Sequence, residues 1–419
     1  MRLRVLLMLL IQLQLFSCGT SPIRVSAQPD ARPVGEEAVT IYALGDWGTG
    51  DERQRAVAIA LREDIRELEK ASPEGRPAPL VVELGDNIYP NGLPKRPWKD
   101  STVFALLENT FGNKYHDVQY RGAPVHFYVL PGNHDYARGF RNNDKEWGDV
   151  IHQETTAESL YSNFHYYPLH HSGIPDSNDR EEFERLQSAP LEALTAPQKI
   201  PLPERAGKLV SLYALDTQMF LDLYAAGNDS LIHRYWQQLH EVLQTDSSLW
   251  KIFLGHHPTR TYGRHGGFYR LKEWVWSGTR DFIPPYVRPL TFLWVPALTV
   301  MIDKWLVRHP QDLDNRYYKA FARDLEAVMR KYGITLYISG HEHNLQLIRI
   351  RNRDLNRDYF QVISGAAGRT SEVPGPRGNL LFSHHGLGFV RVEATPEALW
   401  LKFVGVEGKS GTSHSLGQF

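Results

Sequence analysis

The sequence carries almost no net charge and contains a single cysteine. Its 47 Lys and Arg residues are balanced by 48 Asp and Glu, which gives a formal net charge of −1. This balance argues against a protein that binds nucleic acid through a basic face. Because one cysteine cannot form an intrachain disulfide, the fold must be stabilised by its hydrophobic core. A chain of 419 residues, 42% of them hydrophobic, is long enough to bury a large core.

The N-terminal segment has the pattern of an export signal. Arg2 and Arg4 precede an apolar stretch from Val5 to Phe16, which is too short to span a bilayer as a mature helix. We therefore expect residues 1–17 to be a signal peptide that directs the protein across the inner membrane.

The end of this stretch, Leu15-Phe16-Ser17-Cys18, resembles the lipobox of bacterial lipoproteins, with Phe16 bulkier than the usual residue. The resemblance implies that Cys18 is lipidated and anchors a periplasmic or cell-surface protein to the membrane. Residues 18–37 are polar, Pro-rich and without periodicity, which predicts a flexible tether. The alternative is a plain secretory signal that happens to contain a cysteine.

Five apolar runs of strand type each end in glycine followed by a side chain able to bind metal. They are Thr40–Leu44 before Gly45-Asp46, Leu80–Leu84 before Gly85-Asp86, Val125–Leu130 before Pro131-Gly132-Asn133, Trp250–Leu254 before Gly255-His256, and Ile334–Ser339 before Gly340-His341-Glu342-His343. Glycine lets the backbone turn sharply at a strand end. Because ligand sites in α/β folds lie at the carboxyl ends of strands, these turns predict one shared site.

Helical patterns lie between these strands, and further strands follow them. The predicted helices are one after the capping residue Asp51, Leu231–Leu243 and Tyr317–Met329; the later strands are Gln346–Ile350, Tyr359–Ile363, Leu387–Val392 and Leu399–Val404. Helices that alternate with strands, followed by a strand-rich end, predict an α/β architecture.

Two segments interrupt this alternation. Residues 172–207 are polar and contain several prolines, which predicts a surface excursion. Residues 270–315 are rich in Trp, Phe and Tyr, and their uncharged stretch from Pro289 to Ile302 is too short to span a membrane. We expect an insertion that packs on the domain or roofs the active site. The alternative is an interfacial patch that rests on the membrane.

The side chains at the strand ends form a set of seven donors. They are Asp46, Asp86, Tyr89, Asn133, His256, His341 and His343. Carboxylate, phenolate, amide and imidazole ligands suit Fe, Zn or Mn. Seven donors are too many for one tetrahedral zinc ion and enough for two ions that share a bridging ligand.

The order of these blocks resembles that of the calcineurin-like metallophosphoesterases. In Gly85-Asp86-Asn87-Ile88-Tyr89 the tyrosine follows the aspartate by three residues, as in purple acid phosphatases, and the small tartrate-resistant type is the most similar. The resemblance covers roughly residues 38–408. It implies one domain, a four-layer α/β/β/α sandwich of two mixed sheets, with a dinuclear metal site at the strand carboxyl ends. We expect residues 409–419 to be a C-terminal tail.

The resemblance also implies a division of the ligands. Asp46, Tyr89 and His343 would hold a ferric ion, whereas Asn133, His256 and His341 would hold a divalent Fe, Zn or Mn ion. Asp86 would bridge the two ions. This division is physically reasonable, because anionic oxygens favour the trivalent ion and imidazoles with an amide suit a divalent one.

Three residues are expected to contact the substrate. Asn133, His134 and His265 would bind the phosphate, and the two histidines would stabilise phosphoryl oxygens or protonate the leaving alkoxide. His257 occupies a position that is often aromatic in the family.

The predicted activity is hydrolysis of small phosphate monoesters by attack of a metal-bound hydroxide at phosphorus, as in acid phosphatases. Two alternatives stay open, because the metals grip only the phosphoryl centre and the surrounding loops set specificity. One is a phosphodiesterase or pyrophosphatase that acts on nucleotides or lipid headgroups. The other is a catalytically silent surface scaffold.

Overall fold

The computed structural model of the protein describes seven parts of the chain. These are residues 36–94, 99–136, 147–168, 197–268, 310–352, 357–408 and 411–418. The predicted signal peptide, Cys18, most of the tether and most of the 270–315 insertion lie outside the described residues. Across the described ranges, no helix has both the length and the apolar character that crossing a bilayer requires.

Two seven-stranded sheets form the centre of the domain. The first, in the order β16-β15-β14-β1-β2-β5-β6, consists of β1 (Val39–Leu44), β2 (Leu80–Glu83), β5 (His126–Val129), β6 (Phe164–Tyr166), β14 (Leu387–Ala394), β15 (Leu399–Glu407) and β16 (Thr412–Gln418). β1, β2, β5 and β6 pair in parallel, whereas β14, β15 and β16 are added antiparallel, so this sheet is mixed.

The second sheet has the order β13-β11-β12-β10-β9-β8-β7. It consists of β7 (Gln198–Lys199), β8 (Val210–Leu215), β9 (Trp250–Gly255), β10 (Leu336–Ser339), β11 (Leu345–Asn352), β12 (Arg357–Ser364) and β13 (Leu380–His384). It too is mixed, because β8, β9, β10 and β12 are parallel and the remaining pairings are antiparallel. A short ribbon of β3 (Gln119–Tyr120) and β4 (Ala123–Pro124) is separate from both sheets.

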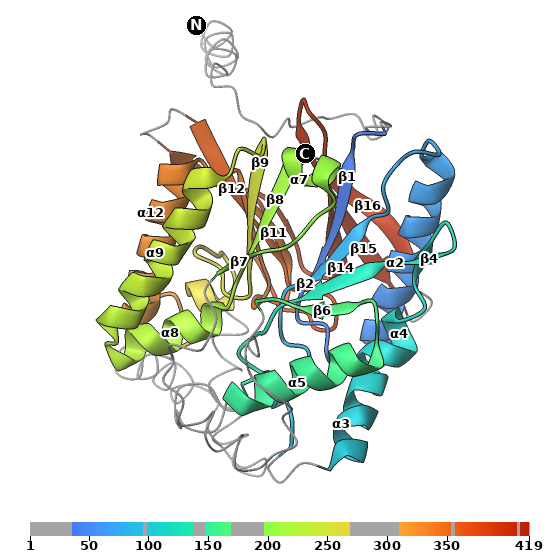
Figure 1. The fold of residues 1–419 in the computed structure, drawn as a ribbon, viewed down its shortest axis with the longest axis horizontal. Helices are drawn as coiled ribbons and strands as arrows, with labels where there is room; N and C mark the ends of the chain where they lie inside the picture. The colour runs from blue at the N-terminus through green and yellow to red at the C-terminus, as the bar shows by residue number, and fades with distance from the viewer. Residues whose placement is uncertain are drawn as a thin grey trace, which may run out of the picture.

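Helices cover the outer faces of both sheets (Figure 1). On the first sheet lie α2 (Glu52–Ala71) and α5 (Trp147–Leu160), and α3 (Asp100–Leu107), the π-helix η1 (Glu108–Gly112) and α4 (Asn113–Tyr115) pack into the same hydrophobic core. On the second lie α8 (Thr217–Ala226), α9 (Asp229–Thr245) and α12 (Arg316–Tyr332). The short α7 (Glu204–Leu209) leads into β8, and the 3₁₀ turn η3 (Arg264–Gly266) follows β9.

Three hydrophobic cores separate these four layers. Val57 and Leu61 of α2 pack on Tyr42 and Val81 of the first sheet. Between the sheets, the core contains Ile41, Val82, Ile252 and Ile338. Behind the second sheet, it contains Phe220, Phe321, Leu325 and Tyr337. Alternate residues of a strand face opposite sides, so each sheet buries both faces. The predicted four-layer sandwich is confirmed.

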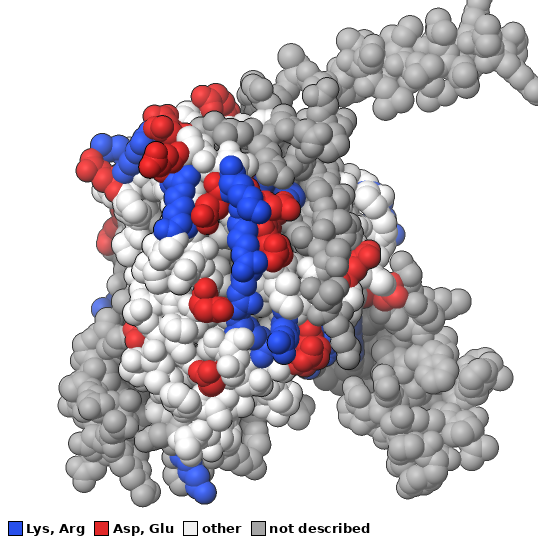
Figure 2. Space-filling view, turned by 90° about the vertical axis from the view of Figure 1, so that its right-hand side faces the viewer, with Lys and Arg blue, Asp and Glu red and all other residues white. Residues whose placement is uncertain are grey.

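A buried group of charges joins α2 to the first sheet. Asp64 of α2 lies 2.6 Å from both Arg391 of β14 and Lys402 of β15, and it accepts a 2.8 Å hydrogen bond from Tyr42. The solvent face of α2 carries both signs of charge, and Figure 2 shows Lys and Arg interspersed with Asp and Glu on this side of the molecule.

Two predicted segment boundaries are wrong. Residues 409–419 are not simply a tail, because β16 pairs with β15 and widens the first sheet. Its sequence, Thr-Ser-His-Ser-Leu-Gly-Gln, has no apolar alternation to reveal a strand. The predicted excursion 172–207 likewise includes β7, which pairs with β8, and the start of α7.

Candidate active site

The five predicted loops converge at the carboxyl ends of β1, β2, β5, β9 and β10, where the two sheets meet. At three of them the backbone adopts the left-handed conformation: φ is 58° at Asp46, 60° at Asp86 and 68° at His341. Among the described residues, Arg121 is the fourth non-glycine residue with positive φ. Such backbone strain concentrates at functional sites, where it aims side chains that regular geometry would misplace.

Asp46, Tyr89 and His343 form one group, the tyrosine cluster. The Tyr89 hydroxyl lies 3.0 Å from Oδ1 of Asp46 and 3.3 Å from Nε2 of His343. His343 Nε2 is 3.4 Å from Asp46 Oδ1. Two ligands at right angles and about 2.1 Å from one ion would be about 3.0 Å apart, so these separations suit a shared cation.

Asn133, His256 and His341 form a second group, the imidazole cluster. Oδ1 of Asn133 lies 2.9 Å from Nε2 of His256 and 3.1 Å from Nδ1 of His341. The two imidazole nitrogens are 3.3 Å apart. Sequence positions 133, 256 and 341 therefore meet within the span of a single ion.

Asp86 lies between the two clusters and turns one oxygen to each. Its Oδ2 is 2.7 Å from the Tyr89 hydroxyl, whereas its Oδ1 is 3.5 Å from Nε2 of His256. The backbone N–H of His134 donates to Oδ1 at 2.9 Å and fixes the carboxylate. A carboxylate held in this way can contact two ions at once.

The imidazole cluster fits a metal ion because it presents lone pairs to one point. Nδ1 of His256 lies 2.8 Å from the carbonyl of Leu84, and Nε2 of His341 lies 3.1 Å from the carbonyl of Gln311. A carbonyl only accepts, so each of these nitrogens donates its proton outward. Burial, and then the neighbouring imidazoles, lower the pKa of His341 well below its usual value, which keeps it neutral. Nδ1 of His341, which faces Asn133, then carries no proton and can bind a metal ion.

The tyrosine cluster also fits a cation. Burial, followed by the charges of Asp46 and Asp86, raises the pKa of Tyr89 well above its usual value. Burial would raise the pKa of Asp86 too, but His256, His134 and the hydrogen bond from Tyr89 outweigh it and lower this pKa. The carboxylates of Asp46 and Asp86 thus share the one phenolic proton of Tyr89. A bound cation would balance their negative charges better than this single proton does. Ligand atoms of Asp46, Asp86 and His256 all lie within 4.8 Å of one another, so these residues, drawn from both clusters and the carboxylate between them, could hold a metal ion.

His134 lies at the open side of the site. Its Nδ1 donates to the carbonyl of Pro90, which leaves Nε2 facing Asp86 at 3.9 Å. Its ring contacts that of Tyr89, with centroids 4.6 Å apart, and about 30% of its side chain is exposed. It can therefore reach a molecule that enters from solvent.

His265 lies on the other side of the imidazole cluster, against His341, with ring centroids 4.1 Å apart. Its Nδ1 lies 2.8 Å from Oδ1 of Asp312. Burial would lower the pKa of His265, but the Asp312 hydrogen bond and the nearby Glu342 raise it. Glu342 also accepts the backbone N–H of His265 at 2.7 Å, so it fixes the loop instead of facing the metal ligands.

His257 is part of the support, not of the ligand set. Its Nδ1 lies 2.8 Å from Oγ1 of Thr217 and its Nε2 lies 2.6 Å from Oε1 of Gln311. Both nitrogens are therefore engaged, although the ring contacts His341. The same Gln311 accepts from His341 through its carbonyl, so His257 positions a ligand indirectly.

Some residues that support this site were not among the candidates predicted from the sequence. Gln311 and Asp312 fall in the segment 270–315, expected to be an insertion, yet they contact His341 and His265. Asp135 is buried and accepts from the backbone N–H groups of Asp86, Asn87 and Gly132 at 2.7–3.0 Å. It therefore ties the second and third loops together.

Gly85 is required where these loops touch. Its φ is +91°, and a Cβ at this position would lie 2.7 Å from the nitrogen of Gly132 and 2.8 Å from Nδ1 of His256. Only glycine tolerates both the conformation and the close approach.

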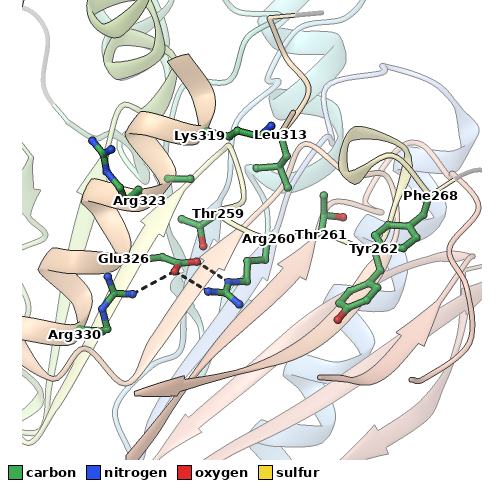
Figure 3. A pocket seen from close by; sticks show the side chains of 11 residues that line it. Thr259, Arg260, Thr261, Tyr262, Phe268, Leu313, Lys319, Arg323, Glu326 and Arg330 are labelled. Carbon is green, nitrogen blue, oxygen red and sulfur yellow. Dashed lines mark hydrogen bonds and ion pairs between the residues drawn. The ribbon is translucent and has the colours of Figure 1, made fainter. Parts of the chain in front are cut away.

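A pocket of about 460 Å³ lies beside the loop that follows β9 (Figure 3). Thr261, Tyr262 and Phe268 line one part of it, and none of the predicted metal ligands contributes to its lining. Glu326 lies 2.7 Å from Arg260 and 3.4 Å from Arg330, so these two cations of the pocket lining share one carboxylate.

The comparisons with known proteins agree with this geometry. The family model for calcineurin-like phosphoesterase matches residues 39–345. The tartrate-resistant acid phosphatase type 5 of Oryctolagus cuniculus is 23% identical over 395 residues, covering 88% of this chain and 87% of that protein. The purple acid phosphatase 3 of Arabidopsis thaliana is 22% identical over 269 residues, covering 61% of this chain and 57% of that protein.

Among solved structures, PhoD superimposes with a TM-score of 0.51 at 12% identity, covering 91% of this chain and 69% of that one. This likeness shows the fold alone. The family model extends over most of the domain, and the five loops that it spans are those that meet at the site. The chain therefore belongs to the calcineurin-like phosphoesterase family and is a phosphoester hydrolase.

Proposed function

We propose that the protein hydrolyses phosphate monoesters at a dinuclear centre, as its acid phosphatase relatives are named for doing. The observation that carries the proposal is the position of Asp86, whose two oxygens face the tyrosine and imidazole clusters. The tyrosine cluster, with its phenol and carboxylate, suits Fe(III), and the imidazole cluster suits a divalent Fe, Zn or Mn ion. When bound, such ions polarise a phosphoryl group and acidify a water molecule.

The residues of the chain would then bind the ester and move protons. Asn133, His134 and His265 border the space between the clusters and solvent, and would contact the phosphate. His134 has Nε2 free toward the site, because Nδ1 donates to Pro90. Asp312 keeps the Nδ1 proton of His265 in place, so that Nε2 would face the ester. Either imidazole can donate a proton to a leaving alkoxide.

The test compares hydrolysis of an aryl phosphate monoester and the matching bis-aryl diester by the purified protein from pH 4 to pH 8. Asp86→Ala serves as the blank, because loss of the shared carboxylate would disable both clusters. We expect the wild type to prefer the monoester at acidic pH. A preference for the diester near neutral pH would contradict the proposed monoesterase activity. It would remain consistent with a phosphoester hydrolase. Equal rates for wild type and Asp86→Ala would contradict the proposed centre.

We further propose that lipidation of Cys18 anchors the domain outside the inner membrane. The sequence pattern at Leu15-Phe16-Ser17-Cys18 supports this, and residues 18–37 would give the domain reach. In a bacterial host, the wild type should partition into a detergent phase and Cys18→Ser into the aqueous phase. A detergent-phase fraction that the substitution leaves unchanged would contradict the anchor.

A further inference from the structure

Arg369 lies beside Tyr89 at the partly exposed side of the site. Its guanidinium carbon is 4.0 Å from the centroid of the Tyr89 ring, and its side chain is half-buried. Among the residues that the structure describes, none forms an ion pair with Arg369. By contrast, Arg260 and Arg391 are paired with carboxylates. A half-buried cation without a counter-ion, beside a polar site, is suited to meet an incoming anion.

The backbone on both sides of Arg369 is attached to the loops of the tyrosine cluster. The N–H of Ala367 donates to the carbonyl of Gly45 at 3.1 Å, next to Asp46. The N–H of Ser371 donates to the carbonyl of His343, and the N–H of Gly365 donates to that of Asn344 at 3.2 Å. These bonds hold the backbone of the segment against the ligand loops, and they place the side chain of Arg369 where its guanidinium contacts the Tyr89 ring.

The exposure of the surrounding residues shows from which side an anion would arrive. Asp46, Asp86 and His256 are fully buried and form the floor of the site. Tyr89, His134 and Arg369 are half-buried and border its open side. The guanidinium carbon of Arg369 lies 4.0 Å from the centroid of the Tyr89 ring, and a guanidinium that packs one face on a ring can still donate from the N–H groups at its edges. Those edges match two oxygens of a phosphate.

We infer that Arg369 binds the terminal oxygens of the substrate phosphate and thereby selects doubly charged monoesters over diesters. This inference rests on the proposed monoesterase function. A monoester has three non-bridging oxygens and about two negative charges near neutral pH, whereas a diester has two such oxygens and one charge. Ions held by the tyrosine and imidazole clusters would bind some of the non-bridging oxygens. Arg369 would bind the additional oxygen that a monoester has and a diester lacks.

A purely packing role makes a different prediction. If Arg369 only held the Tyr89 ring in place, its loss would affect both substrates equally and would alter bound metal. If Arg369 binds phosphate oxygens, its loss would weaken the binding of orthophosphate and would reduce hydrolysis of the monoester more than that of the diester. The two cases are therefore separated by ligand binding and by the ratio of the two activities.

The experiment compares Arg369→Gln and Arg369→Lys with the wild type, all as full-length purified protein. Arg316→Gln is the matched control, since Arg316 also lies over a tyrosine ring, that of Tyr317 at 4.4 Å, which is not a predicted ligand. Calorimetry measures the Kd of inorganic phosphate, metal analysis measures occupancy, and kcat/KM is measured for the aryl monoester and the bis-aryl diester.

We expect Arg369→Gln to weaken phosphate binding about 10- to 100-fold, as loss of a charge-assisted bidentate contact does, with metal content unchanged. The monoester-to-diester ratio of kcat/KM should fall about tenfold. Arg369→Lys should recover part of the binding, and Arg316→Gln should match the wild type.

Unchanged phosphate binding in Arg369→Gln, or equal losses for both esters, would overturn the inference. If the wild type binds phosphate through Arg369 but hydrolyses neither ester, the inference stands as an anion site and the proposed function fails. If the wild type binds no phosphate, the inference is overturned.

Discussion

The carboxylate of Asp312 lies 2.8 Å from Nδ1 of His265, whose ring in turn packs on that of His341. This hydrogen bond sets which nitrogen of His265 carries a proton and where the other one points. Asp312 is thus a positioning residue for the proposed proton donor.

We expect Asp312→Ala to lower kcat/KM for the monoester about 10- to 100-fold without loss of bound metal, as removal of an orienting partner does. Asp312→Asn, which keeps an acceptor oxygen, should recover part of the activity. The double variant with His265→Asn should be no slower than His265→Asn alone, because both act through one imidazole. Additive losses in this double-mutant cycle would show that Asp312 does not act through His265.

Tyr89 should determine the colour of the protein if its cluster holds Fe(III). We expect the purified wild type to contain iron and to have a broad visible absorption band, and we expect Tyr89→Phe to lose that band. Tyr120→Phe is a suitable control, because its buried hydroxyl has no hydrogen-bond partner among the described residues. A colourless, active protein without iron would refute the ferric assignment. Absorption spectra and metal analysis on the same samples decide the question.

The packing around Gly85 makes it sensitive to a single methyl group. Gly85→Ala would place a Cβ 2.8 Å from His256 Nδ1 in a left-handed conformation. We expect a loss of several kcal/mol of stability, from the strained φ and the displaced loop, together with reduced metal content. Gly375→Ala is the control, since its Cβ would meet no atom within 4 Å. Thermal unfolding of the two variants, each with metal analysis, gives the comparison; equal melting temperatures would contradict this account.

The buried Asp64 should make stability depend on pH. Burial would raise the pKa of Asp64, but Arg391 and Lys402 outweigh it and lower the pKa. Because the folded pKa is below the unfolded value of about 3.9, the stabilisation is complete above that value and is lost as pH falls through the folded pKa. Asp64→Asn should cost roughly 1–3 kcal/mol at pH 7, since it removes the carboxylate that pairs with Lys402 and one of the two that pair with Arg391, which keeps Glu393.

This deficit should stay constant from pH 7 to pH 5 and shrink below about pH 4, as measured by urea unfolding. Glu63→Gln is the neighbouring control, because its pair with Arg66 is more than half exposed and contributes little. A deficit that is independent of pH down to pH 3 would mean that the charge of Asp64 is not what stabilises this interface.

The sequence by itself determined the strands and the residues at their ends. Runs such as Thr40–Leu44 and Trp250–Leu254 are mostly apolar because each sheet buries both faces, and the glycine after each run marks the turn. The order of those turns was enough to predict the family, the α/β sandwich and the seven candidate ligands.

Only the tertiary structure decided the geometry in which those ligands meet and the residues that support them. Asp86 faces both clusters because φ at this residue is positive, which the residue type alone does not specify. Asp312 and Arg369 reach the site from segments without a motif, one at the end of an aromatic-rich stretch and one after β12. The run Tyr359–Ile363 followed by Ser364-Gly365 repeats the strand-then-glycine pattern and could have drawn attention to Arg369. Local pattern predicts where a chain turns, whereas contacts between residues hundreds of positions apart depend on how the two sheets pack.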